Sequence, residues 1–289
     1  MSKKYTVVGG DLRSIKLANL IAADGSKVNI YGFKNAGFEL GITESESLEE
    51  AVRNTDIIIG PLPCSNDNET LTAPFHPGKI YINEVFKIMS KNQLFIAGRI
   101  SEKIEHMAQA YNVYSVDILE REEMAVLNAI PTAEGAIQIA MEEMPITLHD
   151  SNALILGYGR IGKILAKMLH ALGARVYVEA RKYSDLAWIK SYGYIPVNLN
   201  ELDRYLDSMD VIFNTIPHVL LDSEKLKLLH QDCLIVDLAS KPGGVNFESA
   251  RALGRKAIWA LSLPGKVAPV TAAKFIKETI YNVINELGV

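Results

Sequence analysis

The segment GYGRIG, from Gly157 to Gly162, holds glycines at the spacing Gly-x-Gly-x-x-Gly. A short apolar run, NALIL, precedes it, and a segment with apolar residues at helical spacing follows it. In such a setting the first glycine permits a tight turn, the second lets the backbone approach a pyrophosphate, and the third lets the helix pack close to the strand. The helix start also offers free N–H groups to phosphate. The segment predicts a dinucleotide-binding turn made by Gly157, Gly159, Arg160, Ile161 and Gly162.

The end of the next expected strand, in the stretch VYVEARK, indicates which dinucleotide is bound. An acidic residue roughly 20 positions after the first glycine usually holds the ribose 2′-hydroxyl of NAD. Here Ala180 occupies that position, and Arg181 follows with a guanidinium that suits a 2′-phosphate, with Lys182 and Ser184 beside it. The pattern predicts NADP rather than NAD as the cofactor. The alternative is that Glu179 points into the site and that Arg181 is only a solvated charge.

A second glycine pair follows the first expected strand, in YTVVGGDLRS. Gly9 and Gly10 are adjacent, and no third glycine follows at the spacing that a dinucleotide turn needs. We therefore expect no second dinucleotide site here. Asp11 and Arg13 come directly after this strand. Either they face a ligand, or they serve as a helix cap and a surface cation.

These turns must be positioned by elements that alternate along the whole chain. Apolar strand-like runs are interrupted by segments with helical spacing, such as LRSIKLANLIAA and SEKIEHMAQAYN. The expected strands are YTVVG, KVNIYG, DIIIGP, IYINE and QLFIAG in a first set and NALILG, RVYVEA, DVIFNT, CLIVDL and KAIWAL in a second. The pattern predicts an α/β fold with two Rossmann-like, doubly wound parallel-sheet domains. Ligands then belong at the carboxyl ends of the strands and in an inter-domain cleft.

The pattern changes in two places. The segment EREEMAVLNAIPTAEGAIQIAMEEMP predicts two successive helices, with Pro131 as the start signal of the second. The tail, VTAAKFIKETIYNVINEL, predicts a long amphipathic helix. Thr132 and Glu134 lie where the chain would cross between domains. Thr132 either caps a helix or touches a ligand, and Glu134 suits a helix N-terminus on dipole grounds.

Composition bounds the possible partners. The chain has 289 residues, 48% of them hydrophobic and 22% charged, and a formal net charge of −4. Neither nucleic acid nor a membrane surface is expected as a partner. The start, MSKKYTVVGGD, does not resemble a signal peptide, and no apolar run approaches the ~18 residues of a membrane span. Cys64 and Cys233 are expected to be reduced thiols of a cytoplasmic protein, and Cys64 has no obvious activating base nearby.

Three later segments, FNTIPH, VDLASKPGGVNF and LSLPGKVAPVTAA, carry a family resemblance. Together with GYGRIG they resemble the nicotinamide domain shared by alanine dehydrogenase, transhydrogenase and the D-2-hydroxyacid dehydrogenases. The combination of GGDLRS, NAIPTAEGAI, EARK and LPGKVAP resembles the A subunit of dipicolinate synthase of spore-forming bacteria over essentially the full length. These segments add Thr215, Pro217 and Ala239 to the expected cofactor-binding residues.

The resemblance implies a function and a domain arrangement. The protein would oxidise dihydrodipicolinate to dipicolinate during sporulation, in the cytoplasm of the mother cell, together with the flavoprotein-like B subunit of dipicolinate synthase. A discontinuous substrate domain would comprise residues 1–129 and 270–289, because the C-terminal helix returns to the first domain. Residues 130–269 would form the NADP-binding domain. A homo-oligomer is expected.

The implied chemistry selects further residues. Oxidation of a dihydropyridine dicarboxylate removes a hydride and a proton, and two carboxylates need cations. The candidate cations at expected strand ends are Arg13, Arg99, Lys241 and Lys266. At least one of the two arginines is expected to face the cleft. His218 follows a strand end and suits proton transfer, unless it is a loop histidine without a role. No histidine pair has metal-ligand spacing, so no metal is expected.

Two alternatives stay open at this point. The protein could be another NAD(P)-dependent oxidoreductase of the same superfamily that acts on a 2-oxo or 2-amino acid. It could also be a cofactor-binding scaffold, with the chemistry carried by the B subunit.

Overall fold

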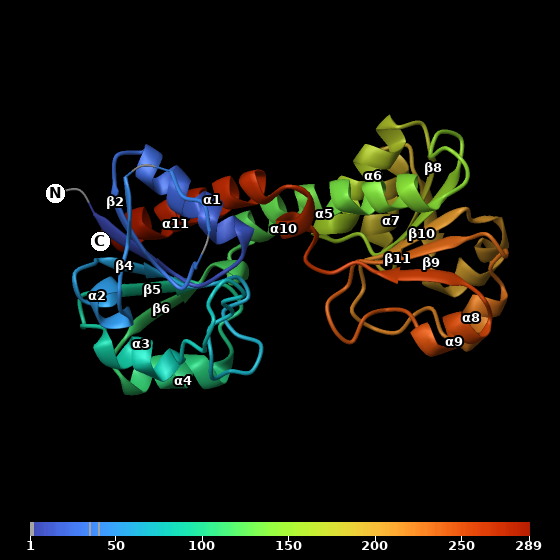
Figure 1. The fold of residues 1–289 in the computed structure, drawn as a ribbon. Coiled ribbons are helices and arrows are strands. Elements are labelled where there is room, and N and C mark those ends of the chain that lie inside the picture. Colours follow the sequence, from blue (N-terminus) through green and yellow to red (C-terminus); the bar gives the residue numbers. More distant parts are fainter. Residues whose placement is uncertain (1–2, 35, 40) are drawn as a thin grey trace. The chain divides into compact units, whose positions relative to one another are not determined.

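The structure is a computed structural model that describes residues 3–34, 36–39 and 41–289. The chain forms two compact units, one running to Leu127 and including Ala268–Val289, the other spanning Asn128–Val267. Each unit contains a six-stranded parallel sheet with helices on both faces (Figure 1). The predicted fold class, two Rossmann-like α/β domains, is confirmed.

The sheet of the first unit has the strand order β3-β2-β1-β4-β5-β6. Its strands are β1 (Lys4–Val8), β2 (Lys27–Tyr31), β3 (Ile42–Glu44), β4 (Ile57–Ile59), β5 (Leu94–Ala97) and β6 (Tyr114–Asp117). Strand order reverses between β1 and β4. The loops that leave the carboxyl ends of these two strands therefore diverge, and this is where ligands bind in open α/β sheets.

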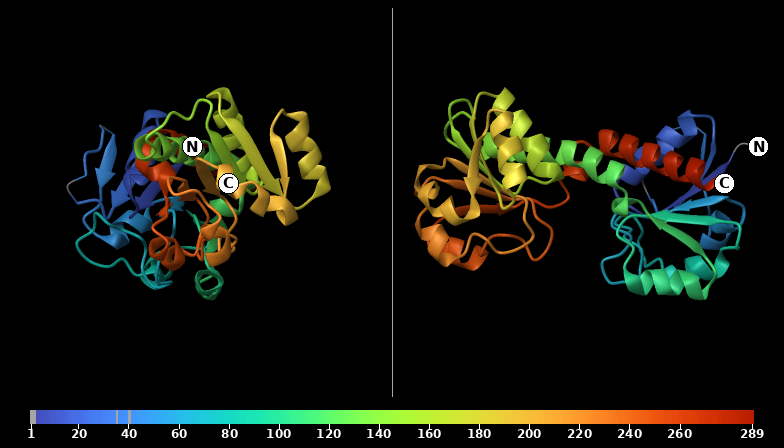
Figure 2. Two further views of the ribbon diagram at one scale, coloured as in Figure 1. Left: turned by 90° about the vertical axis from the view of Figure 1, so that its right-hand side faces the viewer. Right: turned by 180° about the vertical axis from the view of Figure 1, so that it is seen from behind.

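The helices of the first unit divide between the two faces of its sheet (Figures 1 and 2). They are α1 (Leu12–Ala23), α2 (Leu48–Arg53), α3 (Ile82–Ile88), α4 (Glu102–Ala110) and α11 (Pro269–Leu287), with a 3₁₀ turn η1 (Ile118–Glu120). α1 and α11 pack together on one face, where Ile21 and Ile280 share a core with Val7. The C-terminal helix is thus part of the first unit.

The sheet of the second unit has the order β12-β11-β10-β7-β8-β9. Its strands are β7 (Asn152–Leu156), β8 (Arg175–Ala180), β9 (Ile195–Asn198), β10 (Val211–Asn214), β11 (Leu234–Asp237) and β12 (Lys256–Trp259). Its helices are α6 (Arg160–Ala171), α7 (Tyr183–Ser191), α8 (Ser223–Lys227), α9 (Phe247–Ala252) and α10 (Leu263–Val267), with 3₁₀ segments η2 (Leu199–Arg204) and η3 (Leu206–Ser208). α6 and α7 cover one face, and α8 and α9 cover the other (Figures 1 and 2).

The predicted helix start at Pro131 is wrong. One continuous helix, α5 (Glu122–Glu143), begins in the first unit and ends in the second, with Pro131 inside it. A proline within a helix removes one hydrogen bond, here the bond to the carbonyl of Leu127. Burial of the neighbouring Ala133 and Ala136 in the core of the second unit offsets that loss.

The predicted strand IYINE is also wrong, because α3 begins at Ile82. Ile82, Val85 and Phe86 are buried at helical spacing, and Glu84 lies in the first turn, where the helix dipole favours an acid. Strands β3, β6 and β9 were not predicted. Their sequences, ITE, YSVD and IPVN, are mostly exposed or half-buried and lack the apolar runs of central strands. In the part of the chain that the structure describes, no helix has the length and apolarity that crossing a membrane requires.

Candidate functional site

The turn between β7 and α6 has the geometry that its glycines predict. Gly157 has a φ of +96°, and a Cβ there would lie 2.6 Å from the Oγ1 of Thr215. A Cβ on Gly162 would lie 2.1 Å from the carbonyl oxygen of Gly157, so neither position accepts a side chain. A Cβ on Gly159 would meet no atom within 4 Å. The turn therefore has open space at its middle glycine, between two positions that have none.

The start of α6 faces that open space without a side-chain cap. Gly159 is the N-cap residue and makes no side-chain cap hydrogen bond, and no acidic residue lies in the first turn of the helix. Backbone N–H groups at a helix start have no partner within the helix, so they and the positive end of the helix dipole can receive an anion. The side chain of Arg160 is exposed, and Ile161 packs against the core. These features fit a pyrophosphate group.

The end of β8 separates its acid from its cations. Side chains alternate along a strand, and Ala180 packs in the core beneath α6 and α7, so Glu179 points to the opposite face of the sheet. Glu179 is 1% exposed, and its Oε1 has no hydrogen-bond partner among the described residues. Burial raises the pKa of this carboxyl, although Gly157 and Arg181 act in the other direction. The side chains of Arg181, Lys182, Tyr183 and Ser184 are exposed here.

A buried network joins the carboxyl ends of β10 and β11. Asn214 and Asp237 are both fully buried. The Nδ2 of Asn214 donates to the Oδ1 of Asp237 at 2.8 Å, and the same oxygen accepts from the backbone N–H of Ala239 at 3.1 Å. The Oδ2 of Asp237 accepts from the N–H of Gly244 at 2.8 Å. The hydroxyl of Thr215 donates to the carbonyl of Leu156 at 2.9 Å, which ties β10 to β7. These hydrogen bonds hold in place the first residues of the loops that follow β10 and β11.

Several predicted site residues project from the second unit. Pro217 and His218 are exposed on the loop after β10, Lys241 is exposed on the loop after β11, and Lys266 is exposed on α10. Among the described residues, the side chains of His218, Lys241 and Lys266 have no hydrogen bond or ion pair. Ala239 is buried, and its carbonyl accepts from the Nε1 of Trp259 at 2.9 Å. The histidine and the two lysines are therefore available to meet a ligand.

Arg13, in the first unit, is already paired. Its Nε lies 3.0 Å from the Oδ1 of Asp11, its Nη2 lies 2.8 Å from the Oδ2, and Nη2 also donates to the carbonyl of Leu62. Only 11% of the Arg13 side chain is exposed. Asp11 caps α1 by accepting from the N–H of Arg13 at 2.9 Å. Of the two interpretations made from the sequence, this geometry favours the helix cap for Asp11. Arg13 connects the start of α1 to the loop after β4 through its hydrogen bonds.

The Gly9–Gly10 turn differs from the turn in the second unit. The N–H of Gly9 donates to the carbonyl of Tyr31 at 2.9 Å, and the N–H of Gly10 donates to the carbonyl of Thr72 at 2.8 Å. A Cβ on Gly10 would lie 1.9 Å from the Oγ of Ser14. The donors that would bind a phosphate are occupied within the unit.

Two further candidates, Arg99 and Cys64, lie in the first unit. Arg99 is exposed in the turn after β5. Burial, with a smaller effect of Asp117, raises the pKa of the Cys64 thiol to about 12, which suits a neutral core residue rather than a nucleophile.

The two candidates near the predicted domain crossing lie within α5. Thr132 donates to the carbonyl of Asn128 at 2.8 Å. Glu134 lies inside the helix and not at a helix start, because the predicted start at Pro131 does not exist. Within residues 3–34, 36–39 and 41–289 there is no cluster of three or more metal-ligating side chains.

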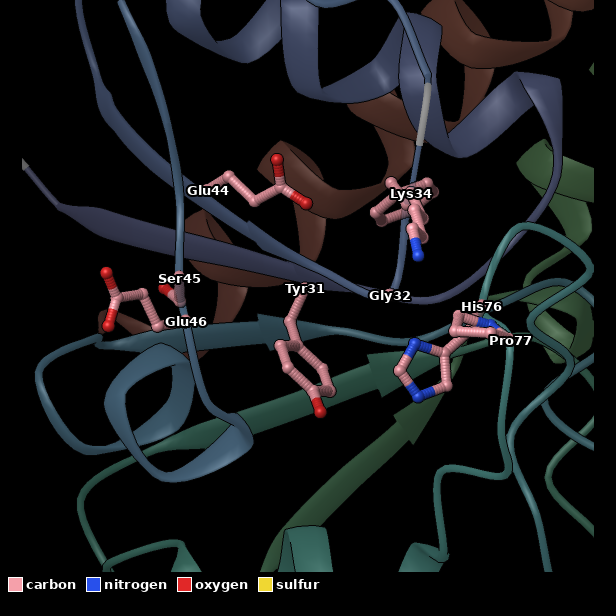
Figure 3. Close-up of a pocket in the computed structure, with 9 residues that line it drawn as sticks. Tyr31, Gly32, Lys34, Glu44, Ser45, Glu46, His76 and Pro77 are labelled. Carbon is pink, nitrogen blue, oxygen red and sulfur yellow. The ribbon is translucent and has the colours of Figure 1, made fainter.

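A pocket that the sequence did not indicate lies at the carboxyl ends of β2 and β3 (Figure 3). It has a volume of about 460 Å³, and none of the predicted site residues lines it. The rings of Tyr31 and His76 lie 5.5 Å apart at a tilt of 45°. Its lining residues are Tyr31, Gly32, Phe33, Lys34, Glu44, Ser45, Glu46, His76 and Pro77. The one available signal was the position of Tyr31 and Gly32 at a predicted strand end.

Family comparisons agree with the two units. Residues 4–119 match the family described as the N-terminal domain of the A subunit of dipicolinate synthase. Residues 131–243 match the family described as "D-isomer specific 2-hydroxyacid dehydrogenase, NAD binding domain". Fold, phosphate turn and these matches define the class: a two-domain protein with the nicotinamide-dinucleotide-binding domain of a dehydrogenase.

The chain is 31% identical, over 98% of its length and 96% of the relative, to the A subunit of dipicolinate synthase from Bacillus subtilis (strain 168). The chain belongs to this family, the A subunits of dipicolinate synthase, and the resemblance seen in the sequence is confirmed. The crystal structure of the A subunit from Bacillus halodurans is 30% identical, with a TM-score of 0.90 over 98% of this chain and 97% of that one. That of the dipicolinate synthase A chain from Bacillus subtilis is 30% identical, with a TM-score of 0.89 over 100% and 97%.

Proposed function

We propose that this chain binds NADP(H) and oxidises dihydrodipicolinate to dipicolinate together with a second, flavoprotein-like subunit. The observation that carries the proposal is an intact nucleotide turn in a chain that matches dipicolinate synthase A chains over nearly its whole length. The relatives are named as one lettered subunit of a synthase, which supports the existence of a partner subunit. Sporulation and the cytoplasm of the mother cell are the setting that this function implies.

The cofactor would be held by the turn and by the end of β8. The N–H groups at the start of α6, with Gly157, Gly159 and Gly162, would receive the pyrophosphate. Exposed Arg181, with Lys182 and Ser184, would bind a 2′-phosphate, while Glu179 stays in the interior and offers the ribose no accessible carboxylate. When bound, the nicotinamide ring supplies hydride acceptance. Thr215, Pro217 and Ala239 lie on the loops expected to face that ring.

The substrate is a planar dicarboxylate, so it needs cations that have no other partner. Arg99 meets this requirement in the first unit, since its guanidinium is exposed and makes no ion pair with the described residues. Arg13 is the weaker candidate, because Asp11 and Leu62 already engage it. Lys241 and Lys266 are the candidates from the second unit. His218 would take up the proton that the dihydropyridine loses along with its hydride.

One experiment tests the reaction and separates it from the alternatives. The purified chain is incubated with NADP⁺ and dihydrodipicolinate, alone and with its second subunit, and both NADPH absorbance and dipicolinate are measured. NADP-dependent formation of dipicolinate in the presence of the second subunit, lost when cofactor binding to this chain is lost, supports the proposal. Turnover of pyruvate, glyoxylate or alanine without dihydrodipicolinate turnover would instead identify a 2-oxo or 2-amino acid oxidoreductase. Activity that needs the second subunit but survives loss of cofactor binding here would identify a scaffold.

A further inference from the structure

Arg99 has a backbone conformation that arginine rarely adopts. The described non-glycine residues with a positive φ are Asn68, Arg99, Asn112, Asp150 and Ser262. Asn and Asp tolerate the left-handed region because their short side chains bond to the local backbone, whereas a long side chain gains nothing there. Arg99, with a φ of 59°, is the member of this set with a long charged side chain. Some other interaction must maintain its conformation.

The carboxylate of Asp117 supplies that interaction. Asp117 ends β6 and pairs in register with Ala97 at the end of β5. Its Oδ1 accepts from the N–H of Arg99 at 2.9 Å and from the N–H of Leu119 at 2.8 Å. Its Oδ2 accepts from the N–H of Ile100 at 2.5 Å. One side chain thus fixes the backbone on both sides of Arg99.

The turn cannot relax into the unit either. A Cβ on Gly98 would lie 2.6 Å from the Cγ of Leu62 and 2.9 Å from the Cγ of Leu119. The N–H of Gly98 donates to the carbonyl of Pro61 at 3.1 Å, and its carbonyl accepts from the N–H of Cys64 at 2.6 Å. The backbone of Gly98 is therefore held by the loop after β4, while the Arg99 side chain is exposed.

Strained backbone that the surroundings hold in place is concentrated at functional sites. Here the strained turn places at the carboxyl edge of the sheet a cation that has no ion pair among the described residues, whereas Arg13 is already paired with Asp11. We propose that Asp117 is a positioning residue, which holds the turn of residues 98–100 so that the Arg99 guanidinium binds one carboxylate of the planar dicarboxylate. This inference rests on the proposed function and adds the residue that sets the geometry of its substrate site.

A double-mutant cycle tests the inference. Affinity of the full chain, with NADP⁺ present, for pyridine-2,6-dicarboxylate is measured by calorimetry for the unmodified protein, Arg99→Gly, Asp117→Asn and the double variant. Loss of a charge-assisted hydrogen bond predicts an affinity about 10-fold or more lower for Arg99→Gly. Asp117→Asn should lower affinity several-fold. In the double variant, Asp117→Asn should cause no further loss, because the side chain that it positions is absent.

Stability separates positioning from a purely structural role. Arg99→Gly should leave the Tm unchanged or raise it by about 1–3 °C, since glycine relieves the left-handed strain. Asn112→Gly is the matched backbone control, with a φ of 56° in the same unit, and Arg53→Gln is the matched charge control. Neither control should change affinity for the diacid, and NADP affinity should stay constant throughout.

Each result has a defined meaning. Unchanged diacid affinity in Arg99→Gly would overturn the inference and leave the proposed function standing. Equal losses from Asp117→Asn with and without Arg99 would also overturn it, because Asp117 would then act through the fold alone. An unmodified chain that neither binds pyridine-2,6-dicarboxylate nor turns over dihydrodipicolinate would overturn the proposed function and this inference together.

Discussion

The two units share one topology at their first strand and helix but use it differently. In both, a strand runs into glycines and then into a helix, β1 into α1 and β7 into α6. In the first unit, the glycine N–H groups bond to Tyr31 and Thr72, and Asp11 caps the helix. In the second, the helix has no side-chain cap and Gly159 faces open space. A phosphate site thus requires donors that the fold leaves unsatisfied, as well as glycines.

The largest expected effect on cofactor affinity comes from a side chain that fills the open space at Gly159. Gly159→Ala should weaken NADP(H) binding by about 2–3 kcal/mol, because a methyl group would occupy the position of the pyrophosphate while the fold has room for it. Fluorescence titration of NADPH measures the change. Gly10→Ala is the counterpart in the first unit. It should lower the Tm through its overlap with Ser14 and leave NADPH affinity unchanged, and a loss of NADPH affinity there would break the comparison.

Cofactor selectivity comes next. Replacing Ala180 with Asp and Arg181 with Leu should weaken NADP(H) binding by about 1–3 kcal/mol, the scale of a lost charge-assisted hydrogen bond. Binding of NAD(H) should weaken less, because NAD(H) has no 2′-phosphate for Arg181 to bind. Titration with both cofactors measures the difference. Equal affinities of the unmodified chain for NADP(H) and NAD(H) would contradict the prediction.

The arginines sharpen the comparison within the first unit. Arg13→Gln should destabilise the protein by about 1–2 kcal/mol, since it removes the bonds to Asp11 and Leu62. Arg99→Gln should cost little stability and raise the KM for substrate. Thermal unfolding and steady-state kinetics measured on both variants separate the two roles. If Arg13→Gln instead kept full stability and raised the KM, Arg13 would be the substrate ligand.

Glu179 gives the smallest expected effect, and it depends on pH. Burial raises the pKa of this carboxyl, so folding binds a proton between the unfolded and folded pKa values. Its contribution to stability is complete below the unfolded pKa and is lost as pH rises through the folded pKa. Glu179→Gln should therefore gain on the order of 1 kcal/mol in free energy of unfolding at neutral pH and nothing in acid. Urea unfolding across pH measures this.

The same variant also tests the alternative interpretation of the β8 strand end. If Glu179 turned outward and held the ribose, Glu179→Gln would weaken cofactor binding. With the carboxyl in the interior, NADPH affinity should not change.

Sequence patterns predicted the elements that depend on residues close together in the chain. GYGRIG and the central strands, such as DVIFNT and CLIVDL, were recognisable because spacing and apolar runs are local signals. The edge strands β3, β6 and β9 lack such runs. The helix start predicted at Pro131 was wrong because α5 packs against distant parts of the chain, and this packing offsets the hydrogen bond that the proline removes.

The site was less predictable than the fold, since pairing depends on contacts across the sequence. Arg13 is engaged by Leu62, 49 positions away, and Arg99 is held by Asp117, 18 positions away. Neither partner is marked by any motif. Residue type and strand-end position selected the candidates, and the contacts distinguish between them.

The buried pair Asn214 and Asp237 has a consequence for the entropy of ligand binding. Both side chains are inaccessible to water, and Asp237, held by Asn214, accepts from the N–H groups of Ala239 and Gly244. Folding of the second unit therefore already removes the conformational freedom of the loop bases. A ligand arriving at His218 or Lys241 has only the exposed loop tips left to order, and the entropic cost of binding falls accordingly.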